Sequence, residues 1–209
     1  MTVSGRWSRL AGGVLLLALG VSNALAVSGR EQMDAFLDGL VTLQAEFRQQ
    51  VWGASQDQRS AGTLYLQRPG RFRWDYRTPD QSIIADGKRI WLDDRELEQV
   101  SYQSQAKALK GTPALLLLDT GPMDKHFEIR ELGAQEGELA WVELLPREQE
   151  AEFTRILVGF ADNQLRELEM TDNFGQITRF DFDKVQRNAD VDPELFVFRP
   201  RPGMDVFGD

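Results

Sequence analysis

The sequence contains no cysteine and one histidine, His126. The absence of cysteine excludes disulfides, thiolate zinc sites, a cysteine nucleophile and a lipid-modified N-terminal cysteine. A single imidazole excludes any metal site that requires two of them. Positive charge is also scarce, because 24 Lys and Arg stand against 33 Asp and Glu, a net charge of −9. This balance argues against nucleic acid as a ligand, since phosphate binding needs clustered positive charge.

Long apolar runs are also lacking, except near the N-terminus. Two arginines, Arg6 and Arg9, precede an apolar stretch that ends in the small-x-small cleavage site Ala24-Leu25-Ala26. The stretch is shorter than the roughly 20 residues that span a bilayer. An uncleaved anchor is the alternative, but the Ala-x-Ala ending favours a cleavable secretion signal. We therefore expect a signal peptide at 1–26 and one domain at 27–209, located in a bacterial periplasm, where the lack of cysteine is an advantage.

A helix is predicted to open the domain. Ser28 and Glu31 have the spacing of a capping box, in which each side chain accepts a hydrogen bond from the other residue's backbone N–H. Apolar residues then recur at helical spacing and form one stripe. They are Met33, Phe36, Leu37 and Leu40.

Further along the chain, apolar and polar residues alternate strictly, as is typical of half-buried antiparallel strands. Pro69-Gly70 separates two such runs and predicts a hairpin, and Asp86-Gly87 predicts a second tight turn. Five more short strands are expected, at 127–132, 139–145, 153–160, 165–170 and 177–185. Many short strands with little helix indicate an antiparallel sheet curved into a barrel or part of one.

Bulky apolar side chains gather on one face of these strands. A curved sheet presents such a face either to a filled core or to a ligand cavity, and the pattern leaves both open. The residues are Leu64, Leu66, Phe72, Trp74, Ile156, Val158, Phe160, Met170, Phe180 and Phe182.

Arg68 shares the inward face with Leu64 and Leu66 by strand parity. A buried guanidinium needs acceptors, because an unpaired buried charge is very costly. Carbonyls at a helix C-terminus would serve, since they lack partners within their own helix. Alternatively, Arg68 lies at the strand end and reaches water.

Residues 112–119 predict a short helix within this β-rich pattern. Thr112 suits the N-cap, Pro113 suits the first helical position, and Gly121-Pro122 would end the helix. Its four consecutive leucines, 115–118, are apolar on every side. Such a helix must be covered by protein on both sides, or it must contact something apolar other than its own sheet. The alternative is an ordinary buried strand or helix under a loop.

Catalytic signatures are lacking. The sequence has no G-x-S-x-G turn, P-loop, calcium loop or dinucleotide fingerprint. His126 begins a predicted strand without a nearby acid pattern, so we expect a surface or strand-end histidine. Asp181 and Asp183 flank Phe182, and both carboxylates point to solvent if Phe182 points inward. We therefore expect no enzymatic activity, no cofactor and no metal.

Several motifs together resemble one known family. Arg68-Pro69-Gly70-Arg71-Phe72-Arg73-Trp74 resembles the RP-x-x-F-x-W hairpin of the periplasmic outer-membrane lipoprotein carrier family, LolA type. Other segments match in order and spacing. They are Phe47-Arg48-Gln49, Gly62-Thr63-Leu64, Ile83-Ile84-Ala85-Asp86-Gly87 with Trp91, Thr112 to Leu117, Asp172-Asn173-Phe174-Gly175-Gln176 and Pro202 to Val206. Each match is weak alone, and the set is specific.

The resemblance implies a mainly β fold with a few α-helices. The expected architecture is an unclosed antiparallel β-barrel, or half-barrel, with a helical lid over an apolar cavity. Arg68 resembles the family arginine that bonds lid backbone and holds the empty cavity shut, and Phe72 resembles an aromatic at the cavity rim. The acyl-chain cavity is then expected to be lined by Leu64, Leu66, Phe72, Trp74, Leu115, Leu116, Ile156, Val158, Met170 and Phe180.

The same resemblance implies a soluble periplasmic carrier, without cofactor and monomeric. It would shield the acyl chains of lipoproteins released from the inner membrane and hand them to an outer-membrane receptor. Its partners would be acylated lipoproteins, an ATP-driven inner-membrane lipoprotein-releasing transporter and that receptor. A receptor of similar fold is itself anchored through cysteine, which this chain lacks. The alternative is a generic lipid- or fatty-acid-binding, or envelope-stress-sensing, half-barrel protein.

Three arginines could form an outward stripe on this acidic chain. Arg71, Arg73 and Arg77 alternate with the inward residues of the hairpin. They predict either a docking surface for an acidic partner or an ordinary solvated strand face.

Overall fold

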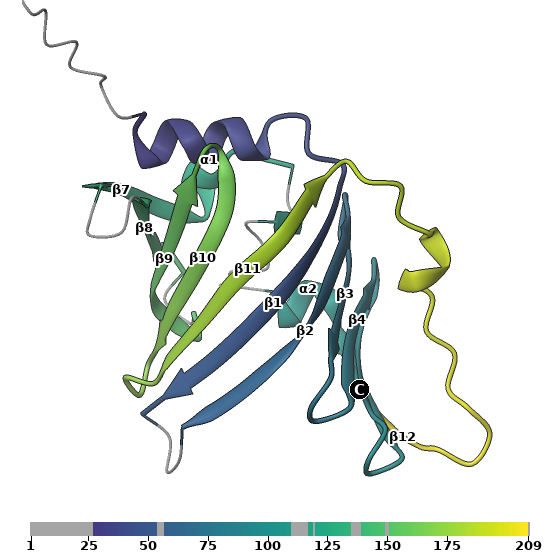
Figure 1. Cartoon of the computed structure of the whole chain (residues 1–209). Helices are drawn as coiled ribbons and strands as arrows, with labels where there is room; N and C mark the ends of the chain where they lie inside the picture. The colour runs from purple at the N-terminus through teal and green to yellow at the C-terminus, as the bar shows by residue number, and fades with distance from the viewer. Residues whose placement is uncertain are drawn as a thin grey trace, which may run out of the picture.

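The computed structural model of the protein describes residues 27–53, 57–109, 117–118, 120–134, 139–148 and 151–208. The predicted signal peptide at 1–26 lies outside these residues. Within them, twelve strands form one curved sheet (Figure 1). The strands are β1 (Thr42–Trp52), β2 (Gln58–Gln67), β3 (Arg71–Tyr76), β4 (Gln81–Asp86), β5 (Arg89–Asp94), β6 (Gln99–Ser104), β7 (Phe127–Ala134), β8 (Ala140–Pro146), β9 (Phe153–Ala161), β10 (Gln164–Asp172), β11 (Ile177–Arg187) and β12 (Asp205–Gly208).

The sheet is open. Its strand order is β12-β6-β5-β4-β3-β2-β1-β11-β10-β9-β8-β7, so β12 and β7 are the two edges. Neighbouring strands run antiparallel, except that β12 lies parallel to β6. The prediction of a mainly β, unclosed antiparallel half-barrel is confirmed.

Both predicted turns are confirmed. In the hairpin of β2 and β3, Leu64 pairs with Trp74 and Leu66 with Phe72, which places the four side chains on one face. Gly70 in this turn has φ +71° and Gly87 in the next has φ +96°. These are left-handed backbone conformations that glycine adopts without steric cost.

The opening helix is confirmed as α1 (Gly29–Leu37). Its capping box is complete: the Glu31 N–H donates to Ser28 Oγ at 3.2 Å, and the Ser28 N–H donates to Glu31 Oε2 at 3.0 Å. α1 lies across one end of the half-barrel and packs against β7 to β10 (Figure 1). Its Met33 and Phe36 are buried in the main apolar core, where Phe36 contacts the ring of Phe160. The helix therefore closes one end of the concave side.

The C-terminal segment covers part of the outer face. The 3-10 helix η2 (Pro193–Phe196) packs against β3 and β4 (Figure 1). Beyond it, Phe198 and Met204 pack on a second small apolar cluster, formed by Ile84, Trp91 and Val100 of β4, β5 and β6. No sequence pattern indicates this crossing, which brings β12 to the edge of the sheet.

Candidate functional site: an apolar cavity

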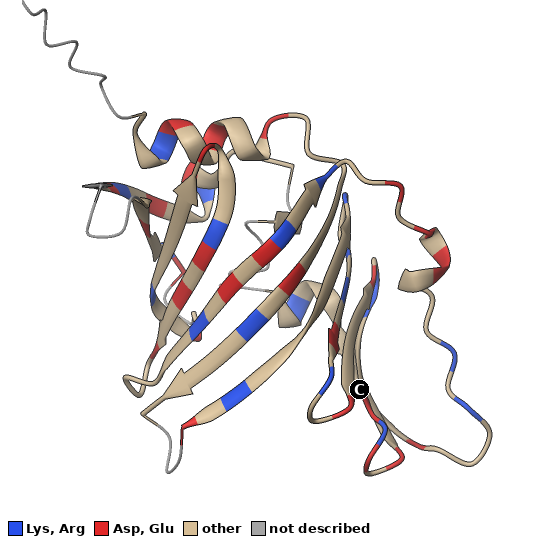
Figure 2. Ribbon diagram, in the orientation of Figure 1, with Lys and Arg blue, Asp and Glu red and all other residues tan. Residues whose placement is uncertain are grey.

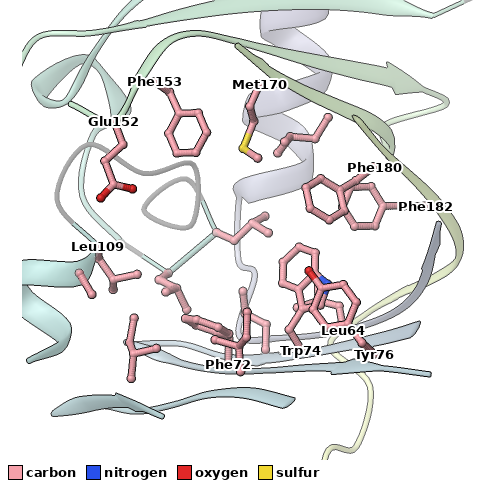
Figure 3. Close-up of a pocket in the computed structure, with 17 residues that line it drawn as sticks. Leu64, Phe72, Trp74, Tyr76, Leu109, Glu152, Phe153, Met170, Phe180 and Phe182 are labelled. Atoms are coloured by element: carbon pink, nitrogen blue, oxygen red, sulfur yellow. The ribbon is translucent and has the colours of Figure 1, made fainter. Parts of the chain in front are cut away.

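An apolar cavity of about 270 Å³ lies on the concave side of the sheet (Figure 3). Side chains from β2, β3, β4, β5, β10 and β11 form its walls. The end of α2 (Gln105–Ala108), residues 117–118 and the segment before β9 close it. The lining residues are Leu64, Leu66, Phe72, Trp74, Tyr76, Ile83, Ile90, Ala108, Leu109, Leu117, Leu118, Glu152, Phe153, Leu168, Met170, Phe180 and Phe182. Glu152 is the one charged residue among them, and it is exposed.

Most of the residues expected to line a cavity do so. Six of them come from four strands and meet around this space: Leu64, Leu66, Phe72, Trp74, Met170 and Phe180. Leu115 and Leu116 lie outside the described residues. Their neighbours Leu117 and Leu118 are helical, buried and part of the cavity wall.

Ile156 and Val158 were expected to line the cavity, and this expectation is wrong, because neither side chain lies in the cavity wall. Both are fully buried on β9, in the same apolar core as Met33 and Phe36 of α1. The concave face of β9 lies where α1 packs on the sheet, so protein side chains fill this part of it. Strand parity placed both residues on the correct face, but it carries no information about which end of the face is covered.

Other lining residues were not predicted. Phe182 was placed on the inward face by parity but was not among the residues expected to line the cavity. Tyr76 and Leu168 alternate in step with Trp74 and Met170, so strand parity could have found them. Glu152 directly precedes β9 and Phe153 begins it, and parity with Ile156 and Val158 does not indicate that either side chain lines the cavity.

Aromatic rings form one wall of the cavity. The Trp74 ring lies 5.1 Å from that of Phe47 and 5.0 Å from that of Phe180, both in tilted or edge-on geometry. The rings of Phe180 and Phe182 stack at 6.2 Å. The Tyr76 hydroxyl donates to Gln49 Oε1 at 2.8 Å, and burial raises the pKa of Tyr76. Ring pairs in such geometries each contribute about 0.5–1.5 kcal/mol beyond the area that they bury.

Arg68 follows β2 directly and joins three parts of the fold. Its Nε donates to the carbonyl oxygen of Leu117 at 2.7 Å, and its Nη1 donates to that of Leu37 at 3.4 Å. Leu37 is the last residue of α1, where carbonyls lack partners within the helix. Arg68 thus binds backbone carbonyls, as its parity suggested, and connects the sheet to α1 and to the helical residues over the cavity.

The prediction that Arg71, Arg73 and Arg77 form an outward stripe is wrong for Arg73. Arg73 is only 19% exposed, because its Nε binds Asp75 at 2.7 Å and its Nη1 donates to the Leu195 carbonyl of η2 at 3.2 Å. The C-terminal segment therefore covers Arg73, and only Arg71 and Arg77 remain exposed. Elsewhere, the outer face carries alternating charges along β1, β10 and β11 (Figure 2). Many of these charges pair across strands, as Arg48 does with Asp183 at 2.9 Å.

The remaining candidates for chemistry lie apart from the cavity. His126 directly precedes β7, and Asp181 and Asp183 flank the buried Phe182. The described ranges contain no group of three or more His, Cys, Asp or Glu placed to hold a metal ion. Among the same residues, no helix is both long and apolar enough to cross a membrane. The arrangement is suited to enclosing an apolar ligand.

Comparisons with known proteins point to one family. The model of the family described as "Outer membrane lipoprotein carrier protein LolA" matches residues 38–199. A protein of Methylococcus capsulatus named outer-membrane lipoprotein carrier protein is 39% identical over 93% of this chain and 94% of its own length. A protein of the same name from Nitrosospira multiformis is 38% identical over 94% and 96%.

One solved structure supports the fold. An uncharacterized conserved protein from Thermus thermophilus superposes with a TM-score of 0.53 at 12% identity, over 87% of this chain and 97% of that one. The range matched by the family model covers β1 to β11, and therefore Arg68 and the cavity-lining strands. From the match to this model and the identity to its curated relatives, we conclude that the chain belongs to the LolA family of outer-membrane lipoprotein carrier proteins.

Proposed function

We propose that this protein is a periplasmic carrier for the acyl chains of lipoproteins. It takes lipoproteins released from the inner membrane and hands them to an outer-membrane receptor. The names of its relatives support this function, and the secretion signal read at 1–26 supports the location. The single observation that carries the proposal is the apolar cavity beneath residues that Arg68 binds.

The energetics explain why such a cavity is needed. Burial stabilises an acyl chain by about 0.8 kcal/mol per CH₂, so exposing one long chain to water costs on the order of 10 kcal/mol. An acylated protein would therefore cross an aqueous compartment very slowly without a carrier. A cavity lined by leucines and aromatic rings removes most of this cost.

An empty carrier must also hide its apolar surface, because exposed apolar patches promote aggregation and adhesion to membranes. The cavity of about 270 Å³ is smaller than most ligand pockets, which span roughly 300–1,000 Å³. In our proposal this small volume belongs to a closed state of the carrier, and the cavity opens to load. In our proposal, Arg68 is the lid latch: its bonds to Leu117 and Leu37 stabilise the closed state and compete with the ligand.

Competition between latch and ligand lowers the apparent affinity, which favours delivery to a receptor that binds the chains better. An ATP-driven inner-membrane transporter would supply the loaded lipoprotein, so the carrier itself needs neither nucleotide nor cofactor. It acts as a monomer and by binding alone, without a catalytic step. Arg71 and Arg77, the exposed pair on the hairpin, are the residues we propose for docking to an acidic partner surface.

Purification of the protein from periplasm tests this function. Mass spectrometry of the copurified material should detect peptides with acylated N-termini. The Phe72→Glu variant, in which a carboxylate enters the cavity wall, is the matched control and should recover far less. Recovery of free fatty acid alone would contradict the proposal and favour a generic lipid-binding protein.

A further inference from the structure

The indole N–H of Trp74 is a buried hydrogen-bond donor in the cavity wall. Within the described part of the chain, Trp74 Nε1 is shielded from solvent and has no hydrogen-bond partner. Its surroundings are apolar and aromatic, with the rings of Phe47 and Phe180 about 5 Å away. Buried polar groups in proteins almost always have a partner, so an isolated donor of this kind calls for an explanation.

Trp91 shows how the same fold treats another indole. Trp91 Nε1 donates to Asp86 Oδ2 at 2.9 Å, on the outer side of the sheet. The two tryptophans differ in position, because Trp74 lines the apolar cavity and Trp91 does not. Because Trp74 lines the cavity, a ligand that enters it comes close to this indole and can bring the acceptor that the described residues do not supply.

A polar groove adjoins the cavity that Trp74 lines. This groove shares four of the cavity's lining residues, Glu152, Phe153, Met170 and Phe180. Polar residues complete this groove, and they include Gln49, Asp172 and Asn173. Trp74 packs on Phe180 and neighbours Tyr76, whose hydroxyl binds Gln49 (Figure 3). The lining thus changes from apolar in the cavity to polar in the groove, and Phe180, which packs on Trp74, lines both.

An acyl chain attached to a peptide has the same polarity profile. Its hydrocarbon tail is apolar, one carbonyl oxygen marks its end, and a polar head follows. We propose that Trp74 Nε1 donates a hydrogen bond to the carbonyl oxygen of the ester or amide that joins the acyl chain to its lipoprotein. The tail then lies among Leu64, Leu66 and Leu117, and the head leaves through the groove. This assignment rests on the proposed carrier function and specifies the acceptor of one residue.

The chemistry of the wall selects this acceptor. An indole N–H only donates, so it needs an acceptor such as a carbonyl oxygen. A charged acceptor is disfavoured, because the surrounding rings and leucines cannot solvate an ion. The bond also fixes how deep the chain enters, since a chain with its carbonyl beyond Trp74 would leave this donor unpaired.

Two matched lipopeptides test the assignment. One carries two ester-linked palmitoyl chains, and the other carries the same chains through ether links, which lack the carbonyl. We expect wild type to bind the ester form about tenfold more tightly, the magnitude of one net hydrogen bond. In Trp74→Phe the ratio should fall to near one, because loss of ring volume affects both ligands equally.

Two controls separate the bond from packing. Trp91→Phe removes an indole outside the cavity and should keep the wild-type ratio. Replacement of Trp74 by benzothienylalanine keeps the ring shape without the N–H, and it should reproduce the loss of discrimination. A peptide with one amide-linked palmitoyl chain identifies the source: a downfield shift of the Trp74 N–H proton with this probe assigns the amide, and a shift with the ester probe alone assigns the ester.

The outcomes distinguish the two proposals. Equal binding of ester and ether forms by wild type, with an unmoved Trp74 N–H signal, would overturn the hydrogen bond and leave the carrier function standing. Failure of every probe to bind wild type would overturn the carrier function and the hydrogen bond with it.

Discussion

Arg68 and Leu117, 49 positions apart in the chain, are joined by a 2.7 Å hydrogen bond from the guanidinium Nε to the carbonyl oxygen. The same guanidinium reaches Leu37 at the end of α1. One side chain at the end of β2 therefore fixes both the helical residues that line the cavity and the helix that closes the barrel end. Hydrogen bonds from a charged donor are roughly twice as strong as neutral ones, so we expect these contacts to stabilise the observed positions of α1 and Leu117 on the sheet.

Replacement of Arg68 by leucine should shift the protein toward the open state. Because the carbonyl bonds disappear, we expect tighter binding of a diacyl lipopeptide, by about tenfold, and slower transfer to an acceptor membrane or receptor. Binding and release of a fluorescent lipopeptide measure both effects. Arg68→Lys keeps the charge but not the planar fork and should be intermediate. Loading and release equal to wild type in Arg68→Leu would exclude the latch role.

Phe72→Glu should impair acyl capture more than folding. The carboxylate would enter a predominantly apolar wall, where a buried charge is costly, so we expect lipopeptide affinity to fall by more than about tenfold. Fluorescence titration measures the affinity, and circular dichroism checks the fold. Phe72→Leu preserves an apolar wall and should bind nearly as well as wild type. Gross unfolding of Phe72→Glu would identify Phe72 as ordinary core.

Ile156 and Met170 are paired across β9 and β10, but only Met170 lines the cavity. Ile156→Ala should lower the free energy of unfolding by about 2–5 kcal/mol, because it leaves a hole in a filled core. Per folded molecule, its lipopeptide affinity should stay within about twofold of wild type, whereas Met170→Ala should weaken binding several-fold. Denaturant unfolding together with titration separates the two effects. Equal effects of both variants on affinity would contradict the boundary drawn here between core and cavity.

Ionisation of the buried Tyr76 hydroxyl should lower the free energy of unfolding at alkaline pH. Burial raises the pKa of Tyr76 in the folded state, whereas an unfolded tyrosine ionises near pH 10. Below about pH 10 the shift contributes fully to the free energy of unfolding. Above about pH 10 this contribution is progressively lost, because the unfolded state releases the tyrosine proton more readily than the folded state.

The free energy of unfolding should therefore fall more steeply above pH 10 in wild type than in Tyr76→Phe, by at most about 1.4 kcal/mol per pH unit. Chemical denaturation across this range gives both slopes. Identical slopes would mean that the Tyr76 hydroxyl reaches water in the folded protein.

The sequence predicted the local elements well, because short-range chemistry determines them. The Ser28 and Glu31 capping box, the turn at Gly70 and the alternation of Phe72 with Trp74 all depend on neighbouring residues. The parallel pairing of β12 with β6 was missed, because it joins Asp205 to Gln99, over a hundred positions away, and leaves no periodic pattern.

The candidate site was predicted less completely, for the same reason. Parity identified the concave face, and therefore Met170 and Phe180, but could not locate α1 over Ile156 and Val158. Arg73 was assigned to solvent because nothing local to β3 indicates that Leu195 of η2 covers it. Which part of a face is covered depends on long-range packing, and only the folded chain shows it.

Photo-crosslinking of a lipopeptide with a diazirine near the middle of one acyl chain tests the central claim most directly. Mass spectrometry of the crosslinked protein should place the label on peptides of β3, β10 and β11, at or beside Trp74, Met170 and Phe180. Peptides of the outer cluster, which contain Trp91 and Val100, should stay unlabelled. Labelling confined to the outer face, or no labelling of the concave face at saturating ligand, would contradict the account that this cavity encloses acyl chains.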